Sequence, residues 1–93
     1  MRLVWTRPAG RDRKAIRENI AQDDPAAALA LDQWLSDGAK RLADHPGLGR
    51  TGRVADTREL VTHQNYILIY DIADDCVCIL RVLHAARQWP PGG

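Results

Sequence analysis

Residues 57–90 read TRELVTHQNYILIYDIADDCVCILRVLHAARQWP, and the rest of the chain is interpreted as packing for the sheet that this segment builds. Residues 66–72 are apolar at nearly every position and carry β-branched and aromatic side chains, which fit a pleated surface. Residues 57–63 alternate more clearly, which favours a strand nearer the edge of a sheet. Residues 76–84 form a third, mostly apolar run. The pattern predicts three consecutive strands, with the middle one covered by helices on at least one face.

The two connections between these strands are short. Gln64 and Asn65 separate the first pair, and asparagine tolerates the positive φ that a two-residue hairpin turn requires. Asp74 and Asp75 separate the second pair. Because turns of this length can join only antiparallel neighbours, we expect a meander. Alternation along the central strand predicts one face with Tyr66, Leu68, Tyr70 and Ile72, and another with Ile67 and Ile69.

The first residues of the chain predict a strand followed by a helix. Residues 2–6 alternate in character and predict a short strand that joins the sheet. Pro8 breaks this strand and suits the start of a helix. The helix is expected over residues 9–22, where a thin apolar stripe runs along an otherwise charged surface.

A second helix is expected over residues 25–44. Asp24 is a favourable N-cap, and Pro25 suits the first helical position. The apolar stripe of this helix contains Leu31, Leu35, Gly38 and Leu42. Trp34 broadens the stripe, and we expect Trp34 and Trp5 in the core. An amphipathic helical hairpin would cover one sheet face, which gives an α+β fold in the order β-α-α-β-β-β.

The length and composition indicate one small domain. The chain has 93 residues, of which residues 1–90 would form the domain and residues 91–93 a disordered tail. No apolar run approaches the roughly 20 residues of a membrane span. We therefore expect a soluble, cytoplasmic protein. Cys76 and Cys78 share one face of a strand at a spacing that rarely allows a disulfide. We interpret them as small apolar residues, and we expect no metal and no cofactor.

The basic residues are mostly arginine, which prefers planar, bidentate partners such as phosphate and carboxylate. A GC-rich genome would also favour arginine codons. Arg50, Arg53 and Arg58 lie within nine residues, with only Asp56 to offset them. The glycine-spaced loop of residues 47–53 is interpreted either as a flexible basic loop that contacts phosphate or an acidic partner, or as a solvated connector. Acidic residues gather instead at the far turn, which would give one end of the sheet a positive field.

Two segments resemble a known family. HPGLGRTGRVADTRELVTHQNYILIYDI at residues 45–72 and ILRVLHAARQWP at residues 79–90 are similar to the ParE branch of the RelE/ParE toxin superfamily of bacterial type II toxin–antitoxin systems. The similarity covers about half of the chain, and the helical half agrees in layout only. It implies a toxin neutralised by a cognate antitoxin, which wraps over the helical hairpin and along the sheet. Operator DNA would be bound only through the antitoxin.

The resemblance implies two alternative targets. ParE-like toxins inhibit DNA gyrase by trapping its complex with cleaved DNA, and so cause growth arrest or stabilise plasmids. RelE-like relatives are instead mRNA endonucleases that act in the ribosome. Their central strand has an arginine after its first tyrosine, where this chain has Ile67, and a C-terminal tyrosine that is absent here. Both departures favour the gyrase inhibitor. A third interpretation is an inactive relic retained as a binding module.

The candidate site residues follow from these alternatives. A ribonuclease would have to rely on a cleft of Arg58, Arg81, His84 and Arg87, with His84 as the general acid or base. Alternatively, His84 closes a strand through a backbone hydrogen bond. Residues expected to bind the target or the antitoxin are Arg50, Arg53, Arg58, His84, Arg87, Gln88 and Trp89. Trp89 is either an interface anchor or a cap on the core.

Overall fold

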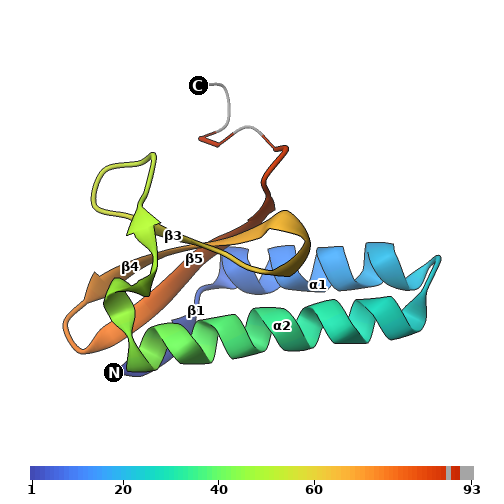
Figure 1. The fold of residues 1–93 in the computed structure, drawn as a ribbon, viewed down its shortest axis with the longest axis horizontal. Coiled ribbons are helices and arrows are strands. Elements are labelled where there is room, and N and C mark those ends of the chain that lie inside the picture. Colours follow the sequence, from blue (N-terminus) through green and yellow to red (C-terminus); the bar gives the residue numbers. More distant parts are fainter. Residues whose placement is uncertain (88, 91–93) are drawn as a thin grey trace.

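The computed structural model of the chain describes residues 1–87, 89 and 90 (Figure 1). The elements follow in the order β1 (Arg2–Trp5), α1 (Arg7–Ala21), α2 (Pro25–Asp44), β2 (Arg50–Thr51), β3 (Arg58–Val61), β4 (Tyr66–Ala73) and β5 (Cys76–His84). Short 3-10 turns occupy Pro46–Leu48 and His63–Asn65. Gln88, which we predicted to contact a partner, lies outside the described residues. So do residues 91–93, for which we predicted a disordered tail.

The strands form one mixed sheet in the order β1-β5-β4-β3-β2. β3, β4 and β5 are consecutive antiparallel neighbours, which confirms the predicted meander. β1 lies parallel to β5, with Arg2 opposite Cys76 and Trp5 opposite Ile79. The two-residue strand β2 was not expected; it pairs with β3 and turns the predicted connector into a hairpin.

The two hairpin turns of the meander differ. Asp74 and Asp75 form the predicted two-residue turn, and Asp74 has a φ of 55°. The prediction of an equally short turn at Gln64 and Asn65 was wrong, because a 3-10 turn widens this connection. Both residues have positive φ, at 57° and 62°. Thr62 closes the turn, since its backbone N–H and its hydroxyl both donate to the carbonyl of Tyr66.

Capping residues set the ends of both helices. α1 begins at Arg7, two residues earlier than expected, because Thr6 caps it by accepting a hydrogen bond from the N–H of Ala9. The Thr6 hydroxyl also donates to the carbonyl of Ile79 at 2.8 Å, which ties the β1–α1 junction to β5. In α2, the Asp24 carboxylate accepts from the N–H of Ala27 at 3.1 Å, which confirms the predicted cap.

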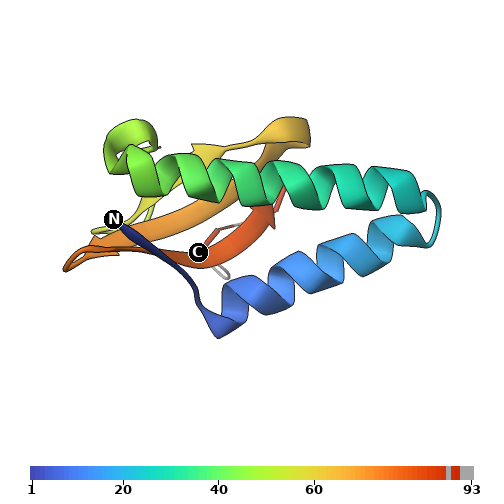
Figure 2. The ribbon, with the colours of Figure 1, turned by 90° about the horizontal axis from the view of Figure 1, so that it is seen from below.

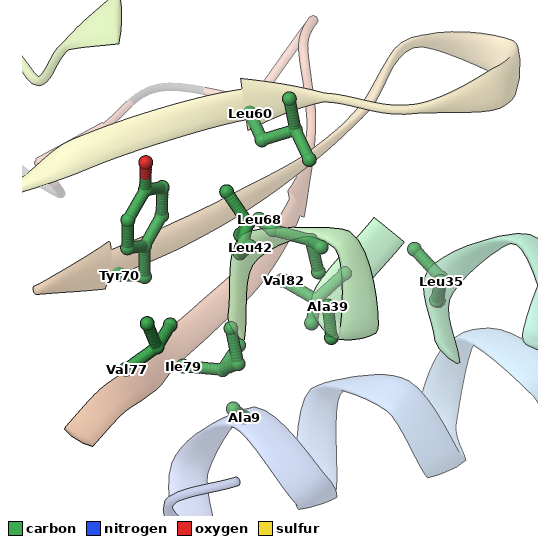
Figure 3. Packing of buried hydrophobic residues seen from close by; sticks show 10 residues of the cluster. All are labelled: Ala9, Leu35, Ala39, Leu42, Leu60, Leu68, Tyr70, Val77, Ile79 and Val82. Carbon is green, nitrogen blue, oxygen red and sulfur yellow. The ribbon is translucent and has the colours of Figure 1, made fainter. Parts of the chain in front are cut away.

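Both helices cover the same face of the sheet (Figure 2). Leu35, Ala39 and Leu42 of α2 pack with Leu68 and Tyr70 of β4 and with β5 (Figure 3). The remaining buried members of this core are Ala9, Leu60, Val77, Ile79 and Val82. The predicted alternation is confirmed for Leu68 and Tyr70, which share one face, and the structure shows that this face is the one covered by the helices.

The opposite face, which we call the open face, carries a smaller apolar cluster. Ile67 and Ile69 of β4 and Leu83 of β5 form it, with Leu80 and Trp89 packed against them. Leu80 reaches this face because β5 has a bulge there: Ile69 pairs with Arg81 and Tyr70 with Ile79, which leaves Leu80 as the extra residue.

The tryptophans divide between core and surface. Trp5 is half-buried against the main core, and the Arg13 guanidinium lies 4.7 Å from the centre of its ring. The prediction that Trp34 belongs to the core was wrong, because 37% of its surface is exposed. Its ring instead packs on His63, with ring centres 3.7 Å apart. None of the helices among the described residues is long and apolar enough to span a membrane.

Candidate functional site

The four residues of the predicted nucleolytic cleft do not form one group. Arg58 pairs with Tyr70 across β3 and β4, whereas His84 pairs with Tyr66 across β4 and β5. These positions are four residues apart along β4, or about 13 Å at the rise of a strand. Arg58 is half-buried, and its Nη1 donates to the carbonyl of Gly49 at 3.1 Å. The expectation that Arg58 shares a cleft with the other three residues was therefore wrong.

Arg81 is held by Asp12 of α1. Its Nε and Nη2 donate to the two carboxylate oxygens at 2.7 and 3.1 Å, and the same carboxylate accepts the N–H of Val82 at 3.0 Å. β1 pairs with β5 only as far as Ile79, so Asp12 satisfies a backbone donor on the uncovered strand edge. The hydrogen bond from Arg81 to Asp12, together with the carboxylate charge, raises the pKa of Arg81 against the opposing effect of burial.

His84 and Arg87 lie together at the end of β5. Both line a shallow hollow of about 180 Å³, shared with Asp12, Ile16 and Tyr66. The His84 Nδ1 accepts the N–H of Ala86 at 3.1 Å, and its ring meets the ring of Tyr66 edge to face at 5.1 Å. Neutral His84 therefore carries its proton on Nε2. This contact is the backbone hydrogen bond expected if His84 closes the strand.

Arg50 and Arg53 of the predicted basic loop are held by Glu59, which the sequence analysis did not count among the acidic residues that offset them. Glu59 is buried on β3, and its Oε1 accepts from Nη2 of Arg50 at 3.4 Å and from Nη2 of Arg53 at 3.3 Å. Its Oε2 accepts the backbone N–H of Arg53 at 3.0 Å. Burial raises the pKa of Glu59, but the backbone N–H and guanidinium of Arg53, with the Arg50 hydrogen bond, outweigh it and hold the pKa below its usual value.

The loop between β2 and β3 also bonds to itself. The N–H of Gly52 donates to the carbonyl of Thr57 at 2.8 Å, and the Thr57 hydroxyl donates to the carbonyl of Val54 at 2.7 Å. A side chain on Gly52 would collide with Thr57, so the close approach requires glycine here. The C-terminal end of the predicted glycine-spaced loop, residues 52 and 53, thus enters a hairpin loop with its own hydrogen bonds.

Trp89 packs against the apolar cluster of the open face. The Arg81 guanidinium lies 5.7 Å from the centre of its ring. The indole N–H is buried and has no hydrogen-bond partner among the residues that the structure describes. This position matches a cap on the sheet, while the role of Trp89 as an interface anchor stays a prediction. Gln88, predicted beside it, is outside the described residues.

The cysteines are free thiols on β5. Their Sγ atoms are 3.4 Å apart, Cys76 is buried and Cys78 is half-buried. The hydrogen bond with Cys76 and burial raise the pKa of Cys78 to about 11, so this thiol stays protonated at neutral pH. Among residues 1–87, 89 and 90, no three His, Cys, Asp or Glu side chains are grouped so as to hold a metal ion.

Three features escaped the sequence analysis. The role of Glu59 was missed because its partners lie six and nine residues earlier, across a hairpin that was not predicted. The role of Asp12 was missed because its carboxylate binds Arg81 at the edge of β5, 69 residues later in the chain. The third feature is a hollow of about 340 Å³ between α2 and the β3–β4 turn, lined by Trp34, Asp37, Gly38, Arg41, Val61, Thr62 and His63.

Known proteins share this architecture. The family model of the ParE toxin of type II toxin–antitoxin systems, parDE, matches residues 3–89. The chain is 42% identical over 90 residues to Y4kP of Sinorhizobium fredii, which is named as a toxin; the match covers 96% of this chain and 93% of that protein. It is also 42% identical over 85 residues to the toxin RelE2 of Caulobacter vibrioides, covering 91% and 96%.

A solved structure gives the same result. A chain of the chromosomal ParDE toxin–antitoxin system from P. aeruginosa superposes with a TM-score of 0.81 at 27% identity, over 90% of this chain and 95% of that chain. The strand, helical hairpin and meander thus agree with the family in sequence and in three dimensions. The chain belongs to the ParE toxin family of type II toxin–antitoxin systems.

Proposed function

We propose that this chain inhibits DNA gyrase and that a cognate antitoxin neutralises it. The observation that carries the proposal is the position of Ile67. It is buried in the apolar cluster of the open face, at the place where the RelE-like ribonucleases have an arginine that binds phosphate. An apolar side chain there cannot stabilise charge on a scissile phosphate. The open face is better suited to binding a protein than to cleaving RNA.

The neighbouring arginine supports this choice. Both Nε and Nη2 of Arg81 are engaged by Asp12, so this guanidinium has few donors left for a transition state. A gyrase inhibitor needs no acid–base pair, only a surface that prefers one state of the enzyme. Arg87 and Trp89 at the end of β5 are of the residue types that dominate such contacts.

The test is growth and supercoiling in parallel. The chain, expressed from an inducible promoter, should arrest growth, and the purified chain should inhibit supercoiling by gyrase and accumulate cleaved plasmid. Arg87→Ala with Trp89→Ala should relieve both effects. The matched control is Arg11→Ala with Leu29→Ala, which removes an exposed arginine and an exposed apolar side chain from the helices. Toxicity retained in a folded double variant would move the target contact elsewhere.

Neutralisation has its own test. If a gene for a small DNA-binding protein lies just upstream, co-expression of its product should restore growth, and the two proteins should copurify. Failure of that neighbour to bind would remove the antitoxin part of the proposal and leave the gyrase part standing.

The second candidate is a ribosome-dependent mRNA endonuclease. One observation favours it: His84 and Arg87 share a hollow with Tyr66 and Asp12, so a general acid or base lies near a cation. Under this alternative, the chain would cut mRNA that is bound to ribosomes, and His84→Ala would abolish this cleavage. Cleavage of mRNA with normal supercoiling would overturn the gyrase proposal.

A further inference from the structure

The cluster of Arg50, Arg53 and Glu59 has a geometry that the fold does not require. Glu59 is buried on the open face and pairs across the sheet with the apolar Ile69. Burying a carboxylate costs several kcal/mol unless its partners compensate. Here three donors satisfy the carboxylate, and all three come from the loop arginines. Glu59 thereby fixes two guanidinium groups beside each other.

The donors that remain distinguish these arginines from the structural ones. Arg13 and Arg81 each present Nε and Nη2 to one aspartate, and their side chains are only 23% and 28% exposed. Arg50 and Arg53 each use a single Nη2 on Glu59, at longer distances, and their side chains are 60% and 44% exposed. Among the described residues, the Nε and Nη1 groups of this pair have no partner.

The charge of the cluster is also incomplete. Residues 50–59 carry three arginines, Arg50, Arg53 and Arg58, against two carboxylates, Asp56 and Glu59, which leaves a net charge of plus one. Asp56 on the same loop makes no ion pair within the described part of the chain. The cluster is therefore complementary to an oxyanion with a single negative charge.

We propose that Arg50 and Arg53, positioned by Glu59, form a clamp for the phosphodiester backbone of DNA. Each phosphodiester carries one negative charge and two free oxygens, and arginine binds such groups through two parallel N–H donors. The hydrogen bonds within the loop hold the clamp in place before binding, which lowers the entropic cost.

The loop lies apart from the helical hairpin, which is one of the two surfaces on which an antitoxin is expected (Figure 1). The loop projects from the domain on the side away from α1 and α2, as the C-terminal segment does (Figure 1). An antitoxin is expected over the helical hairpin and along the sheet. The biological setting rests on the proposed function, in which cleaved DNA is part of the gyrase target, and the clamp would add contact with that DNA.

Fluorescence anisotropy with a labelled duplex of about 20 base pairs tests the clamp directly. We expect weak binding by the full chain, with a Kd of about 10⁻⁴ to 10⁻⁶ M at physiological salt, and a linear fall of log K with log salt. Arg50→Gln with Arg53→Gln should weaken binding at least tenfold at about 50 mM salt and reduce the salt slope by about one, because the clamp neutralises one phosphate. Duplex that does not bind at all would overturn the proposal.

Two further variants separate the clamp from a general effect of charge. Arg7→Gln with Arg11→Gln removes the same charge from the exposed surface of α1 and should change affinity less than threefold. Arg50→Lys with Arg53→Lys should keep the salt slope but still weaken binding, because lysine lacks the planar fork. Equal losses in the α1 and loop variants, or full binding by the lysine variant, would contradict the clamp.

Gyrase, RNA and an acidic peptide complete the test. If the chain binds duplex but leaves gyrase active, the proposed function fails and the clamp stands. If it inhibits gyrase with the same salt dependence in wild type and in the Arg50→Gln, Arg53→Gln variant, the clamp fails and the proposed function stands. Tighter binding to a single-stranded RNA of equal length than to the duplex would assign the arginines to RNA and overturn the inference. If the Arg50→Gln, Arg53→Gln variant loses binding only to a poly-glutamate peptide, the arginines bind an acidic partner, and the inference is overturned as well.

Discussion

Two regions of this small domain use the same ionic groups differently. On the α1 side, Asp12 and Asp32 each hold an arginine through two short hydrogen bonds and join elements that are distant in sequence. Asp32 also accepts a single, longer hydrogen bond from Nη1 of Arg17 at 3.3 Å. In the β2–β3 hairpin, Glu59 is shared by two arginines through single, longer contacts within one local segment. The first arrangement consumes donors, and the second leaves them open to solvent.

The difference shows that burial of a carboxylate and availability of its arginines are separate properties. Glu59 is the most buried of the three acids, yet its arginines are the most exposed. A paired arginine is therefore not automatically a structural one. The number of donors that remain decides whether it can still bind a partner.

The largest expected effect comes from removing the Asp12 carboxylate, which joins α1 to β5. Asp12→Ala removes both hydrogen bonds to Arg81 and the acceptor for the Val82 N–H. We expect the free energy of unfolding to fall by about 3 kcal/mol. For a domain of this size, Tm should then fall by more than about 10 °C, measured by circular dichroism.

An exposed pair provides the control for Asp12→Ala. Glu18→Ala breaks the contact of Lys14 with Glu18, whose atoms are 3.9 Å apart and mostly exposed. Pairs of this kind contribute at most about 0.5 kcal/mol, so Tm should hardly change. A similar fall in Tm in both variants would show that Asp12 stabilises the fold no more than an exposed ion pair does.

A smaller effect is expected from the hydrogen bonds that join Tyr70 of the core to the backbone just before the β2–β3 hairpin. The buried Tyr70 hydroxyl donates to the carbonyl of Pro46 at 2.7 Å and accepts the N–H of Gly49 at 3.0 Å. Tyr70→Phe leaves both backbone groups unpaired and should cost about 2 kcal/mol. Hydrogen exchange at the Gly49 amide should accelerate, which would show that the core holds the hairpin in place.

Tyr66→Phe is the matched control for this link. Tyr66 is half-buried, and its hydroxyl makes no hydrogen bond within the described residues. The expected cost is below about 0.5 kcal/mol. Unchanged exchange at Gly49 in Tyr70→Phe would contradict the link.

The smallest effect concerns Glu59 and depends on pH. Glu59→Gln should cost only about 1 kcal/mol at neutral pH, because the half-exposed arginines can be hydrated. Burial raises the pKa of Glu59, but Arg53 and Arg50 hold it below its usual value in the folded chain, so the unfolded chain binds the proton first as pH falls. The contribution of Glu59 is thus complete above this value and is lost as pH falls through the folded pKa.

Denaturant melts across the acid range measure this dependence. The difference in stability between wild type and Glu59→Gln should shrink between about pH 6 and about pH 3. Asp32, whose pKa is also lowered by Arg13 despite burial, remains in both chains and cancels in the comparison. A constant difference over this range would show that the charge of Glu59 contributes nothing to folding.

Local patterns predicted most of the fold. The apolar run of β4, the aspartate turn before β5 and the Asp24 cap each act over a few residues, so the sequence displays them directly. Trp34 was misplaced because helical periodicity gives the face of a helix but not where its partner layer ends. The candidate site was less predictable. His84 and Arg87 line the same hollow because they lie three residues apart in one segment, whereas Arg58 lies at the other end of the sheet.

Apart from β2, the strands and helices, their order and the family can be inferred from the sequence, because strand alternation, caps and the matching segments are properties of neighbouring residues. Which arginines have their donors occupied and which keep donors available depends on the folded arrangement. That choice depends on where Asp12 and Glu59 lie relative to the edges and hairpins of the sheet. Charge pairing across folded layers acts through distance in space, and composition alone does not encode that distance.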